Sequence, residues 1–120
     1  MQRILIIDDD PDLCRFLKRS LENDGYEIVT VSRCNEISPA LEETWDLILL
    51  DVSMPQIDGW AVAERVRRSG LPSPLYFMSG RADSTFEEAR KEGLIQGALQ
   101  KPFGYDEIRD FLAMVCTAPR

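Results

Sequence analysis

Five polar side chains follow apolar, strand-like segments of this chain, each at the point where a segment ends. Asp8 and Asp9 follow the first such segment, Asp51 follows a later one, and Ser79 and Lys101 follow the last two. If the strands are parallel, their carboxyl ends share one edge of a sheet, which is where open α/β sheets bind ligands. The sequence therefore predicts three carboxylates, a hydroxyl and an ammonium group at one edge.

Three carboxylates at one edge favour a divalent cation. At an effective dielectric near 20, two close carboxylates repel by about 4 kcal/mol, so without a cation one of them would tend to take up a proton. Mg²⁺ prefers carboxylate and carbonyl oxygens, waters and a phosphate oxygen, so Asp8, Asp9 and Asp51 suit it better than they suit zinc. Taken singly, each residue also has a plain structural explanation: an acidic turn before a helix, a turn hydroxyl or a solvated lysine.

Length and charge bound the class of protein. The 120 residues predict one globular domain, residues 1–120, long enough to bury a core without staples. A net charge of −7 argues against direct nucleic-acid binding, because an acidic surface repels phosphate backbones. No apolar run reaches the roughly 20 residues that span a bilayer, and the first residues lack a signal-peptide core. No membrane insertion and a cytoplasmic location are therefore expected.

Histidine and cysteine usage narrows the chemistry further. The chain contains no histidine, so it lacks the commonest general base and metal ligand, and any phosphohistidine must belong to a partner. Cys14, Cys34 and Cys116 are widely spaced and form no Cys-x-x-Cys pair, which argues against a disulfide framework or a zinc site. We expect them to be buried or half-buried side chains.

Five units of a strand followed by a helix account for the chain. Nearly continuous apolar runs predict that the first, third and fourth strands are central, whereas the second alternates and belongs nearer an edge. Asp10 before Pro11 begins a helix that Asp24-Gly25 ends. The alternation predicts right-handed crossovers and a three-layer, doubly wound α/β sandwich. The expected strands are 3–7, 26–31, 46–50, 74–79 and 96–100, and the later helices are 35–44, 58–69, 83–92 and 104–116.

Taken together and in this order, these residues resemble the receiver domain of bacterial two-component response regulators, of the chemotaxis-regulator-like kind. The resemblance covers essentially the whole chain. It implies a flavodoxin-like (βα)5 fold around a five-stranded parallel sheet of order 2-1-3-4-5. The motifs that carry it are Asp8-Asp9, Asp51 with Met54-Pro55, Asp58-Gly59, Ser79, and Lys101-Pro102-Phe103.

The resemblance implies that Asp51 is the phosphoacceptor, Lys101 the family's lysine and Ser79 its switch hydroxyl. Negative charge gathers on the phosphoryl oxygens during attack by Asp51, and Mg²⁺, Lys101 and Ser79 would stabilise it. Pro102 matches a proline that family members usually hold in a cis peptide bond, and Asp58 is interpreted as a helix cap rather than a catalyst. The implied Mg²⁺ ligands are the carboxylates of Asp8, Asp9 and Asp51 and the backbone carbonyl of Ser53.

The expected function is that of a phosphoacceptor module in a two-component phosphorelay. A histidine kinase or histidine phosphotransfer protein donates the phosphoryl group to Asp51, and the altered conformation changes binding to an output partner that the sequence does not identify. The module assists its own phosphorylation and dephosphorylation, so it is not expected to be an enzyme with an external substrate. A phosphorylation-dependent homodimer stays open, as do a stand-alone regulator, a fragment of a longer regulator and a hybrid kinase.

Two alternative functions use the same residues. One is a pseudo-receiver that binds partners without phosphorylation, and the other is a small phosphatase with an aspartyl-phosphate intermediate, which would need aspartate where this chain has Ser53. The pseudo-receiver is slightly favoured by Ala98, because receivers commonly carry Tyr or Phe three residues before the lysine, as a ring that turns inward, and it is opposed by the complete acidic set. We hypothesise that Tyr76 or Phe77 fills the space beside this alanine, although core packing also explains both rings.

Overall fold

The computed structural model describes residues 2–54, 57–80 and 84–116, so Pro55 of the Met54-Pro55 motif and both ends of the 1–120 range lie outside the described residues. Five parallel strands form one sheet, and each lies within about a residue of its predicted limits. Along the chain they are β1 (Arg3–Ile7), β2 (Glu27–Val31), β3 (Leu47–Asp51), β4 (Leu75–Ser79) and β5 (Gly97–Gln100). Their order in the sheet, β2-β1-β3-β4-β5, confirms the predicted doubly wound topology.

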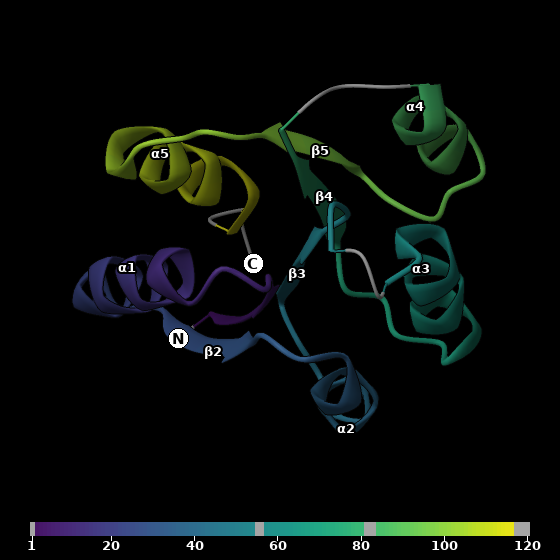
Figure 1. The fold of residues 1–120 in the computed structure, drawn as a ribbon, viewed down its shortest axis with the longest axis horizontal. Coiled ribbons are helices and arrows are strands. Elements are labelled where there is room, and N and C mark those ends of the chain that lie inside the picture. Colours follow the sequence, from purple (N-terminus) through teal and green to yellow (C-terminus); the bar gives the residue numbers. More distant parts are fainter. Residues whose placement is uncertain (1, 55–56, 81–83, 117–120) are drawn as a thin grey trace.

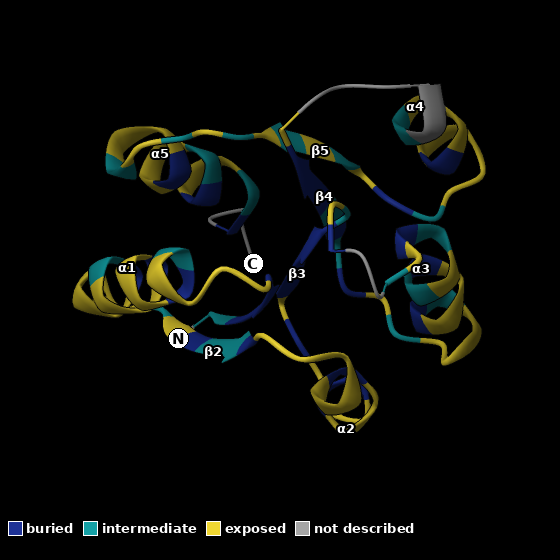
Figure 2. Ribbon diagram, in the orientation of Figure 1, coloured by how far each residue is buried: buried dark blue, intermediate teal, exposed yellow. Residues whose placement is uncertain are grey.

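Helices cover both faces of this sheet, which makes three layers (Figure 1). Two helices, α1 (Pro11–Asn23) and α5 (Tyr105–Cys116), lie on one face. The other face is covered by α2 (Ile37–Ala40), α3 (Gly59–Arg68) and α4 (Ser84–Lys91), with a short 3₁₀ turn (Cys34–Glu36) before α2. The outward surfaces of the helices are exposed, whereas the centre of the sheet is buried (Figure 2).

The apolar run of β3 is explained by its position between the two helical layers. Ile48 and Leu50 belong to the core on the α2–α4 side, whereas Leu47 and Leu49 belong to the core on the α1–α5 side. Successive side chains of a strand point to opposite faces, so a central strand needs apolar residues at every position. Asp51, the last residue of β3, is buried as well. A buried carboxylate therefore lies at the carboxyl edge of the sheet.

Local signals set the ends of α1 as predicted. The side chain of Asp10 accepts hydrogen bonds from the backbone N–H groups of Asp12 and Leu13, and Pro11 occupies the first helical position. The chain leaves the helix through Gly25, whose φ of +98° is one that residues with a side chain rarely adopt. The helix therefore begins directly after the acidic pair of the candidate site.

The second helix is shorter than the predicted 35–44. Pro39 has no N–H group to bond the carbonyl four residues earlier, so the segment divides into the 3₁₀ turn and one short helical stretch. At its end, the indole N–H of Trp45 donates to the carbonyl of Ala40 at 2.9 Å, which satisfies one of the terminal carbonyls. The prediction overlooked both the proline and this long-range cap.

The expected burial of the cysteines is found for two of the three. Cys14 and Cys116 are buried as expected, but Cys34 is exposed, because the 3₁₀ turn that it begins contributes no buried residue.

Within the described ranges, no helix has the length and apolar character that crossing a bilayer requires.

Candidate functional site

The structure brings the predicted polar residues to the carboxyl edge of the sheet. Asp8 follows β1, Asp51 ends β3, Ser79 ends β4 and Lys101 follows β5. One carboxylate oxygen from each of Asp8, Asp9 and Asp51 lies within 4.8 Å of the other two. Asp8 and Asp51 are buried while Asp9 is exposed, so the acidic cluster opens to solvent on the Asp9 side.

Two similar turns hold the buried carboxylates. Asp8 accepts a hydrogen bond at Oδ1 from the backbone N–H of Asp10 at 2.9 Å. Asp51 likewise accepts at Oδ1 from the backbone N–H of Ser53 at 2.9 Å, and the Ser53 hydroxyl donates to the same oxygen at 2.5 Å. An aspartate that bonds the N–H two residues later forms an Asx-turn, which fixes the side chain against its own backbone. Each turn occupies Oδ1 and leaves Oδ2 for other partners.

Lys101 links the two buried carboxylates through those second oxygens. Its Nζ donates to Oδ2 of Asp8 at 2.5 Å and lies 3.5 Å from Oδ2 of Asp51. Lys101 follows β5, the last strand in the sheet order, whereas Asp8 follows β1, three strands away. Its side chain is only 20% exposed, so the long stem crosses the edge largely shielded from water.

Burial and charge shift two pKa values in this cluster. Burial raises the pKa of the Asp8 carboxyl and the nearby charge of Asp51 raises it further, although hydrogen bonds from Lys101 and Asp10 act in the opposite direction. Burial acts to lower the pKa of Lys101, but its hydrogen bond to Asp8 and the charges of Asp8 and Asp51 outweigh this, so that pKa is raised. The lysine is therefore held as an ammonium ion between the carboxylates.

The switch position and the proline lie where the resemblance implies. Ser79 is 7% exposed at the end of β4, and its carbonyl accepts a hydrogen bond from the backbone N–H of Lys101 at 2.7 Å. The Lys101–Pro102 peptide bond is cis, as expected. Asp58 accepts hydrogen bonds from the N–H groups of Trp60 and Ala61 and so caps α3, which agrees with its interpretation as a cap.

The donor set fits a hard divalent cation. Three carboxylates and one ammonium group leave a formal charge of −2 at the edge, which a single Mg²⁺ would balance. The donors are oxygens, with neither imidazole nor thiolate among them, and this suits magnesium rather than zinc. The carbonyl of Ser53 stays a predicted ligand, carried by the turn that directly follows Asp51.

Two contacts of the site were missed from the sequence. The Ser53 hydroxyl was not predicted to hold Asp51. An Asx-turn needs only the backbone N–H two residues after the aspartate, so it gives no signal for this hydroxyl contact. A second is the thiol of Cys14, which donates to the carbonyl of Asp8 at 3.3 Å. That contact depends on the first turn of α1 lying against the end of β1, and no short sequence pattern indicates it.

Comparison with known families agrees with this geometry. Residues 4–113 match the family model described as the response regulator receiver domain. Because the match covers nearly the whole chain, the protein belongs to this family of two-component signalling domains. Members of the family are generally signalling modules rather than enzymes that turn over a substrate.

Individual relatives show both sequence and structural similarity. The chain is 34% identical over 112 residues to the transcriptional regulatory protein PcoR of Escherichia coli, covering 90% of this chain and 48% of PcoR. It is 32% identical over 111 residues to the transcriptional regulatory protein SpaR of Bacillus subtilis, covering 90% of this chain and 49% of SpaR. The chain thus spans about half the length of the curated relatives it matches.

Solved structures share the whole fold. The response regulator TrrA of Thermotoga maritima, solved in complex with Mg²⁺-BeF, superimposes with a TM-score of 0.78 at 28% identity, covering 96% of this chain and 99% of that one. The chemotaxis protein CheY4 of Vibrio cholerae gives a TM-score of 0.85 at 24% identity over 96% of this chain and 98% of CheY4, which shows the fold alone.

The surroundings of Ala98 separate the two aromatic candidates of the sequence hypothesis. Ala98 is aligned with Phe77, so these two side chains share a face of the sheet. Tyr76 is aligned with Gly97 and packs edge-on against Phe111 of α5, on the opposite face. Only Phe77 therefore lies on the side of the sheet where the alanine replaces the usual ring.

Proposed function

We propose that this chain is a phosphoacceptor signalling module in which Asp51 receives a phosphoryl group. The observation that carries the proposal is the buried Asp51 carboxylate, which lies 3.5 Å from the Lys101 ammonium and within 4.8 Å of oxygens from Asp8 and Asp9. A carboxylate oxygen of Asp51 attacks phosphorus, the bond between phosphorus and the donor's imidazole nitrogen breaks, and an aspartyl phosphate forms. The electron pair of the broken bond stays with the leaving imidazole.

The chain's own residues orient and stabilise this reaction. The Asx-turn at Ser53 fixes the plane of the Asp51 carboxylate, so the nucleophile loses little freedom on reaction. Lys101 already neutralises charge at the edge. In the proposed reaction its ammonium group and the hydroxyl of Ser79, which ends the neighbouring strand, contact phosphoryl oxygens on Asp51. The carboxylates of Asp8, Asp9 and Asp51 and the carbonyl of Ser53 would hold Mg²⁺, which would supply positive charge to offset the charge of the phosphoryl oxygens.

The phosphoryl donor carries a phosphohistidine that lies outside these 120 residues, in a histidine kinase or a histidine phosphotransfer protein. The 120 residues contain no histidine that could serve. Access is supported by the exposure of Asp9, which lines a hollow of about 470 Å³ together with Arg33 and Met54. We propose that the imidazole ring and its phosphoryl group approach the edge from this side.

The experiment is phosphorylation with acetyl phosphate in the presence and absence of Mg²⁺, followed by intact mass spectrometry. We expect one added phosphoryl group, dependent on Mg²⁺, and its loss in Asp51→Asn. Asp58→Asn is the matched control, because it removes one exposed carboxylate from the same loop region and should still be phosphorylated. A chain that takes up no phosphoryl group, and binds no beryllium fluoride, is a pseudo-receiver and contradicts the proposal.

Transmission of the signal is proposed to use Phe77 in place of the ring missing at Ala98. Phe77 lies two residues before Ser79 on the same face of β4, and its ring meets that of Phe86 from α4 with centroids 5.7 Å apart. A hollow of about 240 Å³ beside these rings, lined also by Trp60, leaves them room to move. Movement of Ser79 toward a phosphoryl group would then be felt by α4.

NMR spectra of the aromatic rings test this route. On adding Mg²⁺ and beryllium fluoride, the ring signals of Phe77 and Phe86, assigned with Phe→Leu variants, are expected to shift. Those of Tyr76 should stay nearly constant, because that ring packs on the other face. Shifts confined to Tyr76, or rings that do not respond although the ligand binds, would remove Phe77 from the mechanism.

A further inference from the structure

One cation beside the acidic edge takes no part in the proposed attack on phosphorus. Arg33 lines the hollow of about 470 Å³ to which Asp9 also belongs. The remaining described residues of this lining are uncharged: Ser32, Cys34, Asn35 and Met54. Among the described residues, Arg33 is therefore the one cation in the hollow through which the phosphoryl donor is proposed to approach.

The pairing of β1 with β2 places Arg33 at this hollow. Ile7 at the end of β1 is aligned with Val31 at the end of β2. Asp9 and Arg33 each lie two residues beyond this aligned pair, so the loops that carry them leave the same edge and both reach the hollow. The backbone carbonyl of Arg33 accepts a hydrogen bond from the N–H of Glu36 at 3.0 Å, which closes the 3₁₀ turn. The turn therefore fixes the backbone of Arg33 beside the edge.

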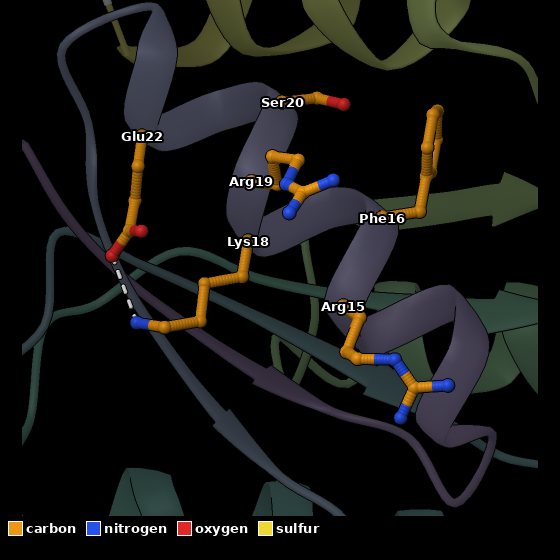
Figure 3. A pocket seen from close by; sticks show the side chains of 6 residues that line it. All are labelled: Arg15, Phe16, Lys18, Arg19, Ser20 and Glu22. Carbon is orange, nitrogen blue, oxygen red and sulfur yellow. Dashed lines mark hydrogen bonds and ion pairs between the residues drawn. The ribbon is translucent and has the colours of Figure 1, made fainter.

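The guanidinium group of Arg33 is available to a ligand. Arg33 is exposed, and it forms no ion pair with the residues that the structure describes. A larger hollow on the outer surface of α1 differs in both respects, because Lys18 there pairs with Glu22 at 2.8 Å (Figure 3) and none of its lining residues belongs to the acidic edge. An arginine stays charged near neutral pH and presents its donors in a plane that matches carboxylate and phosphate oxygens.

The direction of attack brings the leaving group of a donor to the side of Arg33. Asp51 is buried and Asp9 is exposed, so a donor enters from the Asp9 side. In an in-line displacement the leaving atom lies opposite the attacking oxygen and therefore points away from Asp51. The bond to the leaving group is largely broken in the transition state, so a group that departs as an anion already carries much of its charge there. The residues of the hollow are the ones that meet this charge.

On these grounds, and resting on the proposed phosphorylation of Asp51, we infer that Arg33 is a specificity-determining residue that favours phosphoryl donors whose leaving group departs as an anion. With an acyl phosphate, a carboxylate oxygen of Asp51 bonds to phosphorus, the bond from phosphorus to the acyl oxygen breaks, and its electron pair leaves with the carboxylate. Arg33 contacts that oxygen and stabilises its charge. With phosphoramidate, the phosphorus–nitrogen bond breaks and its electron pair leaves with neutral ammonia, which gains nothing from a guanidinium group.

This role divides the possible donors of the chain into two classes. The imidazole of a phosphohistidine departs without negative charge, as ammonia does, so Arg33 does not assist transfer from a phosphohistidine. Small acyl phosphates form the other class, and for them the arginine lowers the barrier. A variant at Arg33 therefore separates phosphorylation by small acyl phosphates from phosphorylation by a phosphohistidine.

The test compares initial rates of Asp51 phosphorylation by acetyl phosphate and by phosphoramidate, with Mg²⁺ present, followed by intact mass spectrometry of the 120-residue chain. Arg33→Gln should slow the reaction with acetyl phosphate about tenfold and leave the rate with phosphoramidate within about twofold. The loss is smaller than the hundredfold or more typical of water-excluded sites, because Arg33 is exposed. Arg33→Lys keeps the charge and should retain most of the rate with acetyl phosphate.

The matched control is Arg19→Gln. Arg19 is likewise an exposed arginine, and it lies in the hollow of Figure 3, away from the acidic edge. This variant makes the same change of charge and side chain, and it should leave both rates within about twofold of the wild-type values.

Two further measurements separate this role from other effects of the arginine. Beryllium fluoride occupies the place of the phosphoryl group without a leaving group, so its affinity for Arg33→Gln should stay within about twofold, which also shows that the variant is folded. The selective loss with acetyl phosphate should persist at an ionic strength of about 1 M, where a Debye length of about 3 Å removes attraction at a distance. If Arg33→Gln fails to fold, Arg33→Met answers the same question.

The outcomes distinguish failure of this inference from failure of the proposed function. Equal slowing with both donors, weaker binding of beryllium fluoride by the folded variant, loss of the selectivity at high salt, or an unchanged rate with acetyl phosphate would each overturn the role of Arg33. In all of these cases Asp51 is still phosphorylated, and the proposed function stands. If the wild-type chain takes up no phosphoryl group from either donor, both fail.

Discussion

Replacing Lys101 with methionine is expected to destabilise the protein in the absence of Mg²⁺. Methionine keeps most of the lysine stem and removes the ammonium group that lies 2.5 Å from Asp8 Oδ2 and 3.5 Å from Asp51 Oδ2. Both carboxylates are almost fully buried, so water cannot take over the role of the lysine. The variant therefore leaves two buried carboxylates without a counterion, and they either repel each other or take up a proton, which also costs free energy at neutral pH.

The two distances give the size of the effect. At an effective dielectric near 20, the gross attraction is about 7 kcal/mol for the Asp8 contact and about 5 kcal/mol for the Asp51 contact. The desolvation of the lysine and of the carboxylates opposes this, and breaking one partner out of a buried pair typically costs about 3–5 kcal/mol in total. Because the Lys101 side chain is 20% exposed, we expect the lower end of that range, about 3 kcal/mol.

Urea unfolding with EDTA measures this free energy in a double-mutant cycle. Lys101→Met is compared with Asp8→Asn and with the double variant, and its cost should fall by about 2 kcal/mol in the Asp8→Asn background. Mg²⁺ should restore much of the stability of Lys101→Met, because it binds the folded state and supplies the missing positive charge. Lys91→Met, at an exposed position in the last turn of α4, is the control and should change stability by less than about 0.5 kcal/mol.

Two outcomes would refute this reasoning. If Lys101→Met costs no more than Lys91→Met, the ammonium group does not hold the carboxylates together. If the cycle is additive, Lys101 and Asp8 do not interact in solution as the 2.5 Å distance indicates.

Three further predictions concern packing and accessibility. Cys34 is exposed and should react with iodoacetamide at pH 8 well before Cys14, because burial first and then nearby negative charges raise the pKa of the Cys14 thiol to about 11; equal rates, measured by peptide mass spectrometry, would contradict this. Gly59→Ala should lower the free energy of unfolding by about 1 kcal/mol, since the added Cβ would lie 2.6 Å from a valine methyl, and a more stable variant would count against the packing. Ser73→Ala should cost about 1–3 kcal/mol in a urea melt because Ser73 Oγ donates to the buried carbonyl of Trp45 at 2.5 Å, and a neutral result would show that the carbonyl finds another donor.

The sequence predicted the layout of the site because strand ends carry the relevant residues. Apolar runs located the strands, and their parallel arrangement placed Asp8, Asp51, Ser79 and Lys101 at one edge. What the pattern could not indicate is which carboxylate Lys101 prefers. Its shortest contact is with Asp8, three strands away, and that choice depends on the twist and packing of the whole sheet. Long-range geometry of this kind leaves no trace in local spacing.

The pairing of β4 with β5 explains why the sequence could not decide whether Tyr76 or Phe77 shares a face with Ala98. Tyr76 and Phe77 are adjacent aromatic residues, yet they lie on opposite faces of β4. Gly97 allows the Tyr76 ring to approach β5, because a Cβ at that position would lie 3.1 Å from the ring. The strand alternation was predictable, but the face that each ring occupies follows from the pairing of β4 with β5.

The arrangement of hydrogen bonds at the edge separates a local part from a long-range part. Oδ1 of Asp8 and of Asp51 is held by the turn that follows each residue, so each carboxylate is positioned by its own segment. Oδ2 of both faces Lys101, whose backbone N–H in turn bonds the carbonyl of Ser79. We therefore expect a charge added to Asp51 to change the contacts of Lys101 with Asp8 and Asp51 first, while the two turns stay in place. Because the lysine is tied to the end of β4, we expect the ends of β4 and β5 to respond together, with β1 and β3 remaining fixed.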